Sequence, residues 1–133
     1  MHEKYIKADK LSKLVLGAAI EVQRQKGPGL MESIYEKCLM RELELQGIPA
    51  ANQLAVPIEY KGYTFRETLR LDVIVGDCLI VEIKVVKEVL QVHKAQLLSY
   101  MKLLDIPIGL VINFYEPFLK KGICRLVLKG ADK

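Results

Sequence analysis

The sequence predicts an α/β fold in which a mixed β-sheet is flanked by helices. Apolar residues recur at helical spacing in two segments near the N-terminus and in one segment after the middle of the chain. Segments rich in Val, Ile and Leu fill the region between them and close the chain. The middle strands are joined by turns too short for anything but antiparallel pairing, whereas a helix joins the next two strands and makes them parallel.

The first two elements are expected to be helices. A helix is predicted over Asp9–Lys26, with Asp9 as N-cap and Gly27-Pro28-Gly29 as its end. Its inward face is expected to consist of Leu11, Leu14, Val15, Ala18 and Val22. A second helix is predicted over Glu32–Gln46, with four apolar residues turned inward: Met31, Ile34, Cys38 and Leu45. Ile48 to Ala51 are expected to form a connector.

Strands and one more helix are expected in the rest of the chain. Lys61-Gly62 and Gly76-Asp77-Cys78 are the predicted turns. The predicted strands are Val56–Tyr60, Tyr63–Leu69, Arg70–Val75 and Leu79–Val86, followed by a helix over Val89–Leu104 and by the strands Ile108–Phe114 and Ile123–Leu128.

Composition limits the classes of protein that fit. The chain has 133 residues, 51% hydrophobic and 27% charged, which excludes a mainly disordered chain and indicates one domain spanning residues 1–133. No apolar stretch reaches the ~20 residues of a membrane span, and the N-terminus lacks the apolar region of a secretory signal. The three cysteines fit no zinc motif and are expected to be reduced thiols, so we expect a cytoplasmic protein. The net charge of +4 is compatible with a polyanionic partner.

The strand Leu79–Val86 carries two charges in apolar surroundings. Alternation places Glu82 and Lys84 on one face, between Ile80 and Val86. Charged side chains rarely occupy such positions unless they are paired or bind a metal. One interpretation is therefore a Glu–Lys pair on a half-exposed strand.

Asp72 favours a different interpretation. If the turn has three residues, Val75 faces Leu79 and Asp72 faces Glu82 on the same side of the sheet. Two carboxylates and one ammonium then converge, and the carboxylates stay ionised only beside a compensating cation. Mg²⁺ favours sites with one or two carboxylates, waters and phosphate oxygens. The sequence therefore predicts a metal site here.

Four segments in this order resemble a known family. Asp72 followed by Glu82-x-Lys84 resembles the PD-(D/E)XK nuclease superfamily, although Leu71 stands in place of the Pro in its name. Gly29 to Tyr35 is similar to the signature of its GxxExxY branch, His93 to Tyr100 to the Gln-bearing helix of that branch, and Gly109 to Phe114 to the strand that follows. The resemblance covers roughly Leu11 to Leu128 and implies a restriction-endonuclease-like core.

The resemblance also implies roles for individual residues. Asp72, Glu82 and the backbone carbonyl of Ile83 would bind Mg²⁺ or Mn²⁺, and Lys84 would assist the attacking water. Glu32 would reach the metal site from its helix, and Gln96 would hold Lys84, a metal-bound water or the nucleic acid. The alternatives are that Glu32 only stabilises the first turn of its helix and that Gln96 is a solvated helix residue.

The expected function is Mg²⁺-dependent endo- or exonucleolytic hydrolysis of nucleic acid, with DNA favoured over RNA. Two alternatives use the same fold: a nucleic-acid- or protein-binding module that does not cleave, and a subunit that needs a partner. We expect no membrane association, and the sequence leaves a homodimer open. The candidate nucleic-acid contacts are Tyr35, Lys87, Lys94, Tyr100, Lys120 and Lys121, of which the two tyrosines could instead be packing residues.

Overall fold

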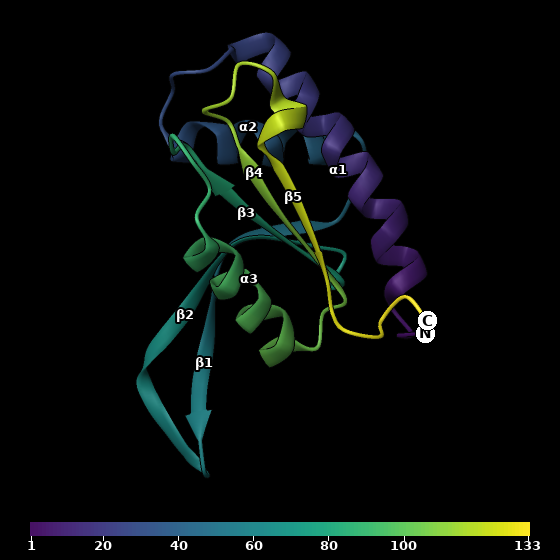
Figure 1. The fold of residues 1–133 in the computed structure, drawn as a ribbon, viewed down its shortest axis with the longest axis vertical. Helices are drawn as coiled ribbons and strands as arrows, with labels where there is room; N and C mark the ends of the chain where they lie inside the picture. Colours follow the sequence, from purple (N-terminus) through teal and green to yellow (C-terminus); the bar gives the residue numbers. More distant parts are fainter.

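The computed structural model describes residues 1–133 as a five-stranded mixed sheet with helices on both faces (Figure 1). This confirms the predicted α/β class. The elements are α1 (Tyr5–Lys26), α2 (Glu32–Leu45), β1 (Ala50–Tyr60), β2 (Tyr63–Val75), β3 (Leu79–Lys84), α3 (Gln91–Leu104), β4 (Ile108–Asn113), a 3₁₀ turn η1 (Leu119–Gly122) and β5 (Ile123–Val127). None of the helices is both long enough and apolar enough to cross a membrane.

The sheet follows the chain in the order β1-β2-β3-β4-β5. Only β3 and β4 are parallel, and α3 connects them as the predicted crossover helix. Val75 pairs with Leu79, which confirms the three-residue turn. The pairing continues only to Val73–Val81, so the predicted pair of Asp72 with Glu82 is not part of the ladder. The register matters for the site because it sets which side chains of β2 and β3 share a face.

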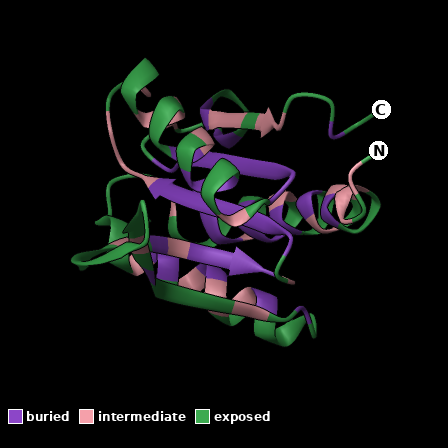
Figure 2. Cartoon of the chain, turned by 90° about the horizontal axis from the view of Figure 1, so that it is seen from below, coloured by how far each residue is buried: buried purple, intermediate pink, exposed green.

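Two hydrophobic cores lie on opposite faces of the sheet. α1 and α2 cover the face of β3 that carries Leu79, Val81 and Ile83, whereas α3 covers the face that carries Ile80. Both central strands are consequently buried on both faces, as Figure 2 shows by their purple colour. A charged side chain in the middle of β3 therefore lies in the interior, not on a solvated face.

The helix α3 packs closely onto β4 at Gly109. A Cβ atom at this position would lie 2.6 Å from Met101 Sδ and 3.0 Å from Leu97 Cδ1, both on α3. Side-chain atoms essentially never come so close, so the helix reaches this depth because position 109 carries no side chain.

Helix α1 begins at Tyr5, so the prediction that Asp9 is its N-cap was wrong. Asp9 lies inside the helix, and its carboxylate accepts a hydrogen bond from Arg125 (2.8 Å) on β5. Leu14, expected to face inward, is exposed. The interaction with β5 explains why an acidic residue occupies the second helical turn.

The buried face of α2 also differs from the prediction. Met31 and Leu45 are exposed, and the buried apolar residues are Tyr35, Leu39 and Leu43. Tyr35 stacks on Phe114 with ring centroids 4.4 Å apart, which orients the helix. The apolar residues of α2 lie on several sides of the helix, so their spacing alone did not select this face.

Strands β1 and β2 extend well beyond the sheet as a two-stranded ribbon, which runs away from the helices in Figure 1. Lys61-Gly62 forms the predicted turn at its tip. β1 starts at Ala50, within the predicted connector and six residues before Val56. Most side chains between residues 51 and 70 are exposed, so burial gives no reason for the length of the ribbon.

Candidate active site

The site forms where β2 and β3 separate. Their ladder ends at the pair Val73–Val81, and Asp72 is the next residue of β2 toward the ribbon. The Ile83 N–H donates a hydrogen bond to Asp72 Oδ2 (2.9 Å), so this carboxylate satisfies a donor that a continued β2 would otherwise pair. Asp72 and Glu82 thus flank an opening between two strands.

The carboxylate of Glu82 is buried without adequate compensation. Glu82 is 6% exposed, and its Oε1 has no hydrogen-bond partner. Burial, followed by the nearby carboxylate of Asp72, raises the pKa of Glu82 from 4.5 to about 8, against the opposing charge of Lys84. A buried acceptor of this kind costs stability unless a proton or a cation reaches it.

Burial also raises the pKa of Asp72, although the N–H of Ile83 and the charge of Lys84 act in the opposite direction. Glu36 contributes further to this rise. The surroundings of both carboxyls therefore favour the neutral form, whereas a nearby cation would favour the ionised form.

Lys84 lies at the end of β3, and no carboxylate comes within ion-pair distance of its ammonium group. The expected alternative, a direct Glu82–Lys84 pair, is thus not what the structure contains. The charge of Lys84 nevertheless acts on both carboxyls by lowering their pKa. Lys84 is half-buried, and its ammonium group keeps its hydrogen-bonding capacity free.

Helix α2 provides one wall of the site. Glu32 Oε1 accepts a hydrogen bond from the N–H of Val85 (3.3 Å), just beyond β3. Glu32, Glu36, Asp72 and Ile83 line a common pocket of about 440 Å³. The structure thus brings Glu32 to the rim of the carboxylate site, in contact with the chain that follows Lys84.

Glu36 is a residue that the sequence interpretation missed. It is buried and accepts hydrogen bonds from Asn52 Nδ2 (3.0 Å) and Gln53 Nε2 (2.6 Å) of β1. A position four residues after Glu32 lies on the same helix face, so the spacing could have identified it. Its interactions connect α2 to the base of the ribbon.

Helix α3 provides the opposite wall. Gln96 Nε2 donates a hydrogen bond to Tyr100 Oη (2.9 Å). Burial, followed by the charge of Glu82, raises the pKa of Tyr100, whereas the Gln96 hydrogen bond lowers it. The phenol hydroxyl therefore lies within electrostatic reach of the carboxylates, and Gln96 orients that hydroxyl instead of contacting Lys84.

Two expected nucleic-acid contacts have to be corrected. Tyr35 is 0% exposed, stacks on Phe114 and donates its hydroxyl hydrogen bond to the carbonyl of Gly27, so nucleic acid cannot reach it in the folded protein. Tyr100 is 8% exposed, and its ring belongs to the core under α3. Neither ring is a platform on which a base could stack.

The four lysines expected to contact nucleic acid fall into two groups. Lys87, Lys94 and Lys121 line one pocket of about 270 Å³ beside the exits of β3 and β4. Lys120 lines a different pocket, against the C-terminal half of α1. Three of the four are thus brought together, and the fourth is separate from them.

Asn113 fixes the chain that leaves β3, and the sequence interpretation gave it no role. Its Oδ1 accepts hydrogen bonds from the N–H groups of Val86 (3.1 Å) and Tyr115 (3.2 Å), and its Nδ2 donates to the carbonyl of Val86 (2.7 Å). The side chain is buried, so these bonds are protected from water. They hold the backbone two residues beyond Lys84. The sequence feature that could have indicated this role is an Asn at the end of an apolar strand.

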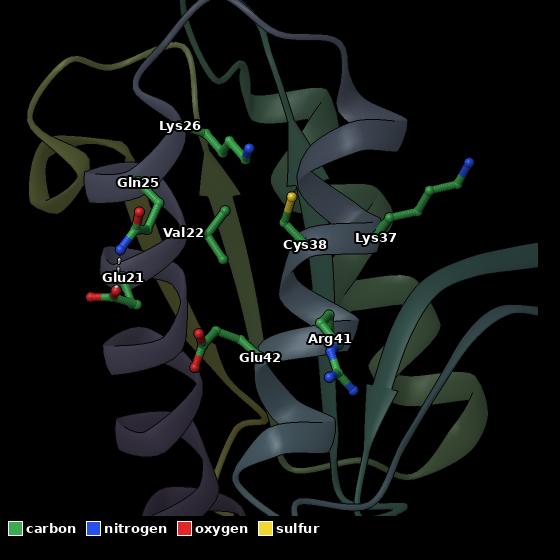
Figure 3. A pocket seen from close by; sticks show the side chains of 8 residues that line it. All are labelled: Glu21, Val22, Gln25, Lys26, Lys37, Cys38, Arg41 and Glu42. Carbon is green, nitrogen blue, oxygen red and sulfur yellow. Dashed lines mark hydrogen bonds between the residues drawn. The ribbon is translucent and has the colours of Figure 1, made fainter.

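A further pocket lies between α1 and α2, away from Asp72 and Glu82 (Figure 3). Charged side chains of both signs line it, together with Val22 and the thiol-bearing Cys38. Glu21 already accepts a hydrogen bond from Gln25 (3.0 Å) and pairs with Arg24. Neither of the two buried side-chain atoms that lack a hydrogen-bond partner belongs to this pocket, so it offers no group comparable to the carboxylate of Glu82.

The donor set at Asp72 and Glu82 fits a hard divalent cation. No group of three His, Cys, Asp or Glu side chains converges as a protein-only metal site would require. Mg²⁺ needs fewer protein ligands, because it is commonly held by one or two carboxylates together with waters and phosphate oxygens. The buried Oε1 of Glu82, which has no hydrogen-bond partner, and the neighbouring carboxylate of Asp72 are oxygen donors of this kind.

Comparison with known proteins identifies the family of the chain. Neither the search of curated proteins nor that of solved structures found a match. The family model described as PD-(D/E)XK nuclease superfamily matches residues 9–126, which include both helical walls and the whole sheet up to β5. Nucleases of this kind generally use divalent metals. The chain therefore belongs to the PD-(D/E)XK nuclease superfamily.

Proposed function

We propose that this protein is a Mg²⁺- or Mn²⁺-dependent nuclease that hydrolyses phosphodiester bonds in DNA. The observation that carries the proposal is the buried carboxylate of Glu82, whose Oε1 lacks a partner while Asp72 lies beside it. A structural role would favour an apolar or fully paired residue in the middle of a buried strand. A metal-binding role explains why the carboxylates are retained there.

Asp72, Glu82 and the backbone carbonyl of Ile83 are the proposed metal ligands. The N–H and C=O groups of a strand residue point to the same side, and the N–H of Ile83 points toward Asp72. The carbonyl of Ile83 is thus directed into the opening between β2 and β3. When bound, the ion would lower the pKa of a water and polarise a phosphoryl oxygen.

Lys84 is the proposed partner of the attacking water. Its ammonium group has no carboxylate partner, so it can donate hydrogen bonds to a water or to a phosphate oxygen. Asn113 holds the chain beyond Lys84, and Glu32 binds Val85, so the backbone at this residue is fixed from two sides. A fixed backbone at this residue lowers the entropy that the Lys84 side chain must lose when it reaches the attacking water.

Glu32 and Gln96 are proposed to act from the rim of the site. Glu32 lines the pocket that contains Asp72 and could accept a hydrogen bond from a metal-bound water. The resemblance of this segment to the GxxExxY branch implies such a role, and we propose that the chain belongs to that branch. Gln96 is proposed to orient the hydroxyl of Tyr100 toward the carboxylates.

DNA is the proposed substrate, and the cytoplasm the proposed location. Lys87, Lys94 and Lys121 form a basic pocket near the end of β3 that could hold phosphates flanking the scissile one. All three cysteines are free thiols, which supports a reducing compartment. A homodimer remains a prediction from the sequence.

The proposal is tested by incubating the protein with supercoiled plasmid, linear duplex, single-stranded DNA and RNA, each with Mg²⁺, Mn²⁺ or EDTA. Cleavage of DNA that requires the metal is expected. Lys84→Ala should lower the rate by about 10²–10⁴-fold, while the control Lys10→Ala, an exposed lysine on α1, should leave it unchanged.

Retention of metal-induced stabilisation by Lys84→Ala would show that the lost group is not a ligand. If the wild type binds DNA but cleaves none of the four substrates with either metal, the proposed nuclease activity is excluded. A non-cleaving module or a partner-dependent subunit would then take its place.

A further inference from the structure

The ribbon formed by β1 and β2 carries an alternating polar row. Thr64, Arg66, Thr68 and Arg70 occupy every second position of β2 and are all exposed. Thr68 and Arg70 lie in the regular part of the β1–β2 ladder, and the next member of their series is Asp72. Arg66 lies in the segment between Thr64 and Thr68, where the register shifts. The row therefore leads along one strand directly to a proposed metal ligand.

The orientation of the row is supported by the residues between its members. Leu69 and Leu71 pack against the core under α3. Thr68, Arg70 and Asp72 consequently point away from α3, and Asp72 lines the pocket on the α2 side. The row and this pocket thus open on the same side of β2.

The arginines of the row differ from the other arginines of the chain. Arg24, Arg41 and Arg125 are each paired with a carboxylate. Arg66 and Arg70 have neither an ion-pair partner nor a side-chain hydrogen bond, and both are exposed. Their guanidinium groups keep every donor available for an anionic ligand.

The ribbon does not owe its shape to a core. A two-stranded hairpin is marginally stable on its own, yet this one continues past the sheet with both faces exposed. At its tip, Tyr63 and Phe65 form an edge-to-face pair with centroids 5.2 Å apart, and the ammonium of Lys61 lies 5.3 Å from the ring centroid of Tyr60. These contacts lie at the turn, where they support the projecting shape of the ribbon.

The dimensions of the ribbon suit a DNA duplex. Its two strands lie about 4.8 Å apart, and the major groove of B-DNA, about 12 Å wide, admits a two-stranded ribbon. Thr64 and Asp72 are eight positions apart, which corresponds to at most about 26 Å at about 3.3 Å per residue, because the register shifts within this segment. This length exceeds the width of the groove, so the ribbon could contact DNA while its base remains at the metal site (Figure 1).

We propose that the row Thr64, Arg66, Thr68 and Arg70 is a binding track for duplex DNA that leads the phosphodiester backbone to Asp72. Hydroxyl and guanidinium groups are among the side chains that commonly contact phosphates. Glu67 lies on the opposite face, and Glu59 faces Thr64 at the far end, so the end of the track nearest Asp72 is the more basic. This inference rests on the proposed nuclease function, because it assigns a substrate-binding surface to that site.

The test compares the double variant Arg66→Gln/Arg70→Gln with the control Lys10→Gln/Lys129→Gln. Both remove two exposed positive charges, but only the first removes them from the ribbon. Binding to a fluorescein-labelled duplex is followed by anisotropy in EDTA, over about 50–200 mM salt. Because the four side chains are exposed, both variants should fold, and circular dichroism with a thermal melt verifies this.

The ribbon variant should bind duplex DNA about thirtyfold more weakly at about 0.15 M salt, since each phosphate contact contributes about fivefold there. Its slope of log K against log salt should fall by about 1.8 relative to the wild type, with the control lying much closer to the wild type. Hydrolysis of bis(p-nitrophenyl) phosphate with Mn²⁺ by the wild type tests the proposed metal site separately from duplex binding.

Equal affinities and equal salt slopes for the ribbon variant and the control would overturn the proposal. A loss confined to single-stranded DNA or RNA would overturn the assignment to a duplex. Binding in EDTA does not require chemistry, so the track can be confirmed even if no cleavage is found. Conversely, the wild type could hydrolyse the small phosphodiester while the ribbon variant binds the duplex as tightly as the wild type. That result would support the nuclease function and overturn the binding track.

Discussion

Replacing Glu82 by Gln should remove a pH-dependent destabilisation of the folded protein. Burial and the charge of Asp72 raise the pKa of Glu82 from 4.5 to about 8 in the folded state. Below pH 4.5 the carboxyl of Glu82 is neutral in both the folded and the unfolded states. Its ionisation therefore does not lower the free energy of unfolding in that range. Between pH 4.5 and about 8 the unfolded chain ionises while the folded protein keeps the proton, so stability is lost as the pH rises.

The size of this effect follows from the shift. A change from 4.5 to about 8 is roughly 3.5 units, and at about 1.36 kcal/mol per unit it amounts to about 5 kcal/mol. This free energy belongs to the Asp72–Glu82 pair, since the two carboxyls titrate together. It is comparable to the whole stability of many domains, about 5–15 kcal/mol, so the wild type without metal should be markedly weakened near pH 8.

Urea denaturation in EDTA from about pH 5 to about pH 8 measures the effect. The free energy of unfolding of the wild type should fall with pH, and that of Glu82→Gln should fall much less, because the amide does not titrate. Glu88→Gln, which alters an exposed carboxylate, should follow the wild type. Mg²⁺ at about 100 times its Kd should restore about 2.7 kcal/mol to the wild type at high pH, but should have a much smaller effect on Glu82→Gln.

Parallel pH profiles for the wild type and Glu82→Gln would refute the reasoning. That result would mean that the carboxylate of Glu82 is solvated or paired in solution. The basis for a metal site at this position would then be lost.

Two further variants test other parts of the site. Asp72→Ala should abolish the increase in melting temperature that millimolar Mg²⁺ or Mn²⁺ gives the wild type, as monitored by differential scanning fluorimetry; an undiminished shift would place the metal elsewhere. Asn113→Ala should lower the free energy of unfolding by about 2–3 kcal/mol, because three hydrogen bonds to Val86 and Tyr115 are lost, and Asn113→Asp should recover part of it by keeping the acceptor. If chemical denaturation gives Asn113→Ala the same free energy of unfolding as the wild type, water replaces the lost amide without loss of stability.

The sequence was sufficient to predict the middle of the sheet. Three residues at Gly76-Asp77-Cys78 and strict alternation on both sides leave one register for β2 and β3, and that register was found. The crossover through α3 followed from the same kind of reasoning, since a helix between two strands permits parallel pairing.

Other features depend on partners distant in the chain. The buried face of α2 could not be chosen from spacing, because the ring that stacks on Tyr35 comes from Phe114 beyond β4. The length of the ribbon gave no burial signal, since both of its faces are exposed. Glu36 could have been predicted as a site residue from the sequence, because it follows Glu32 by one helical turn. Its contacts with Asn52 and Gln53 could not, because they form only in the folded chain.

Gly109 determines how closely one wall of the candidate site can approach the sheet. A methyl group there would meet Met101 Sδ at 2.6 Å, and Met101 directly follows Tyr100 in α3. The hydroxyl of Tyr100 is held within electrostatic reach of Glu82 by the depth at which α3 lies on the sheet. A larger residue at position 109 would have to displace Met101 and Leu97, and with them the helix that carries Tyr100. Such a substitution would change the distance between the phenol and Glu82, and with it the pKa of Tyr100, without replacing any residue of the site.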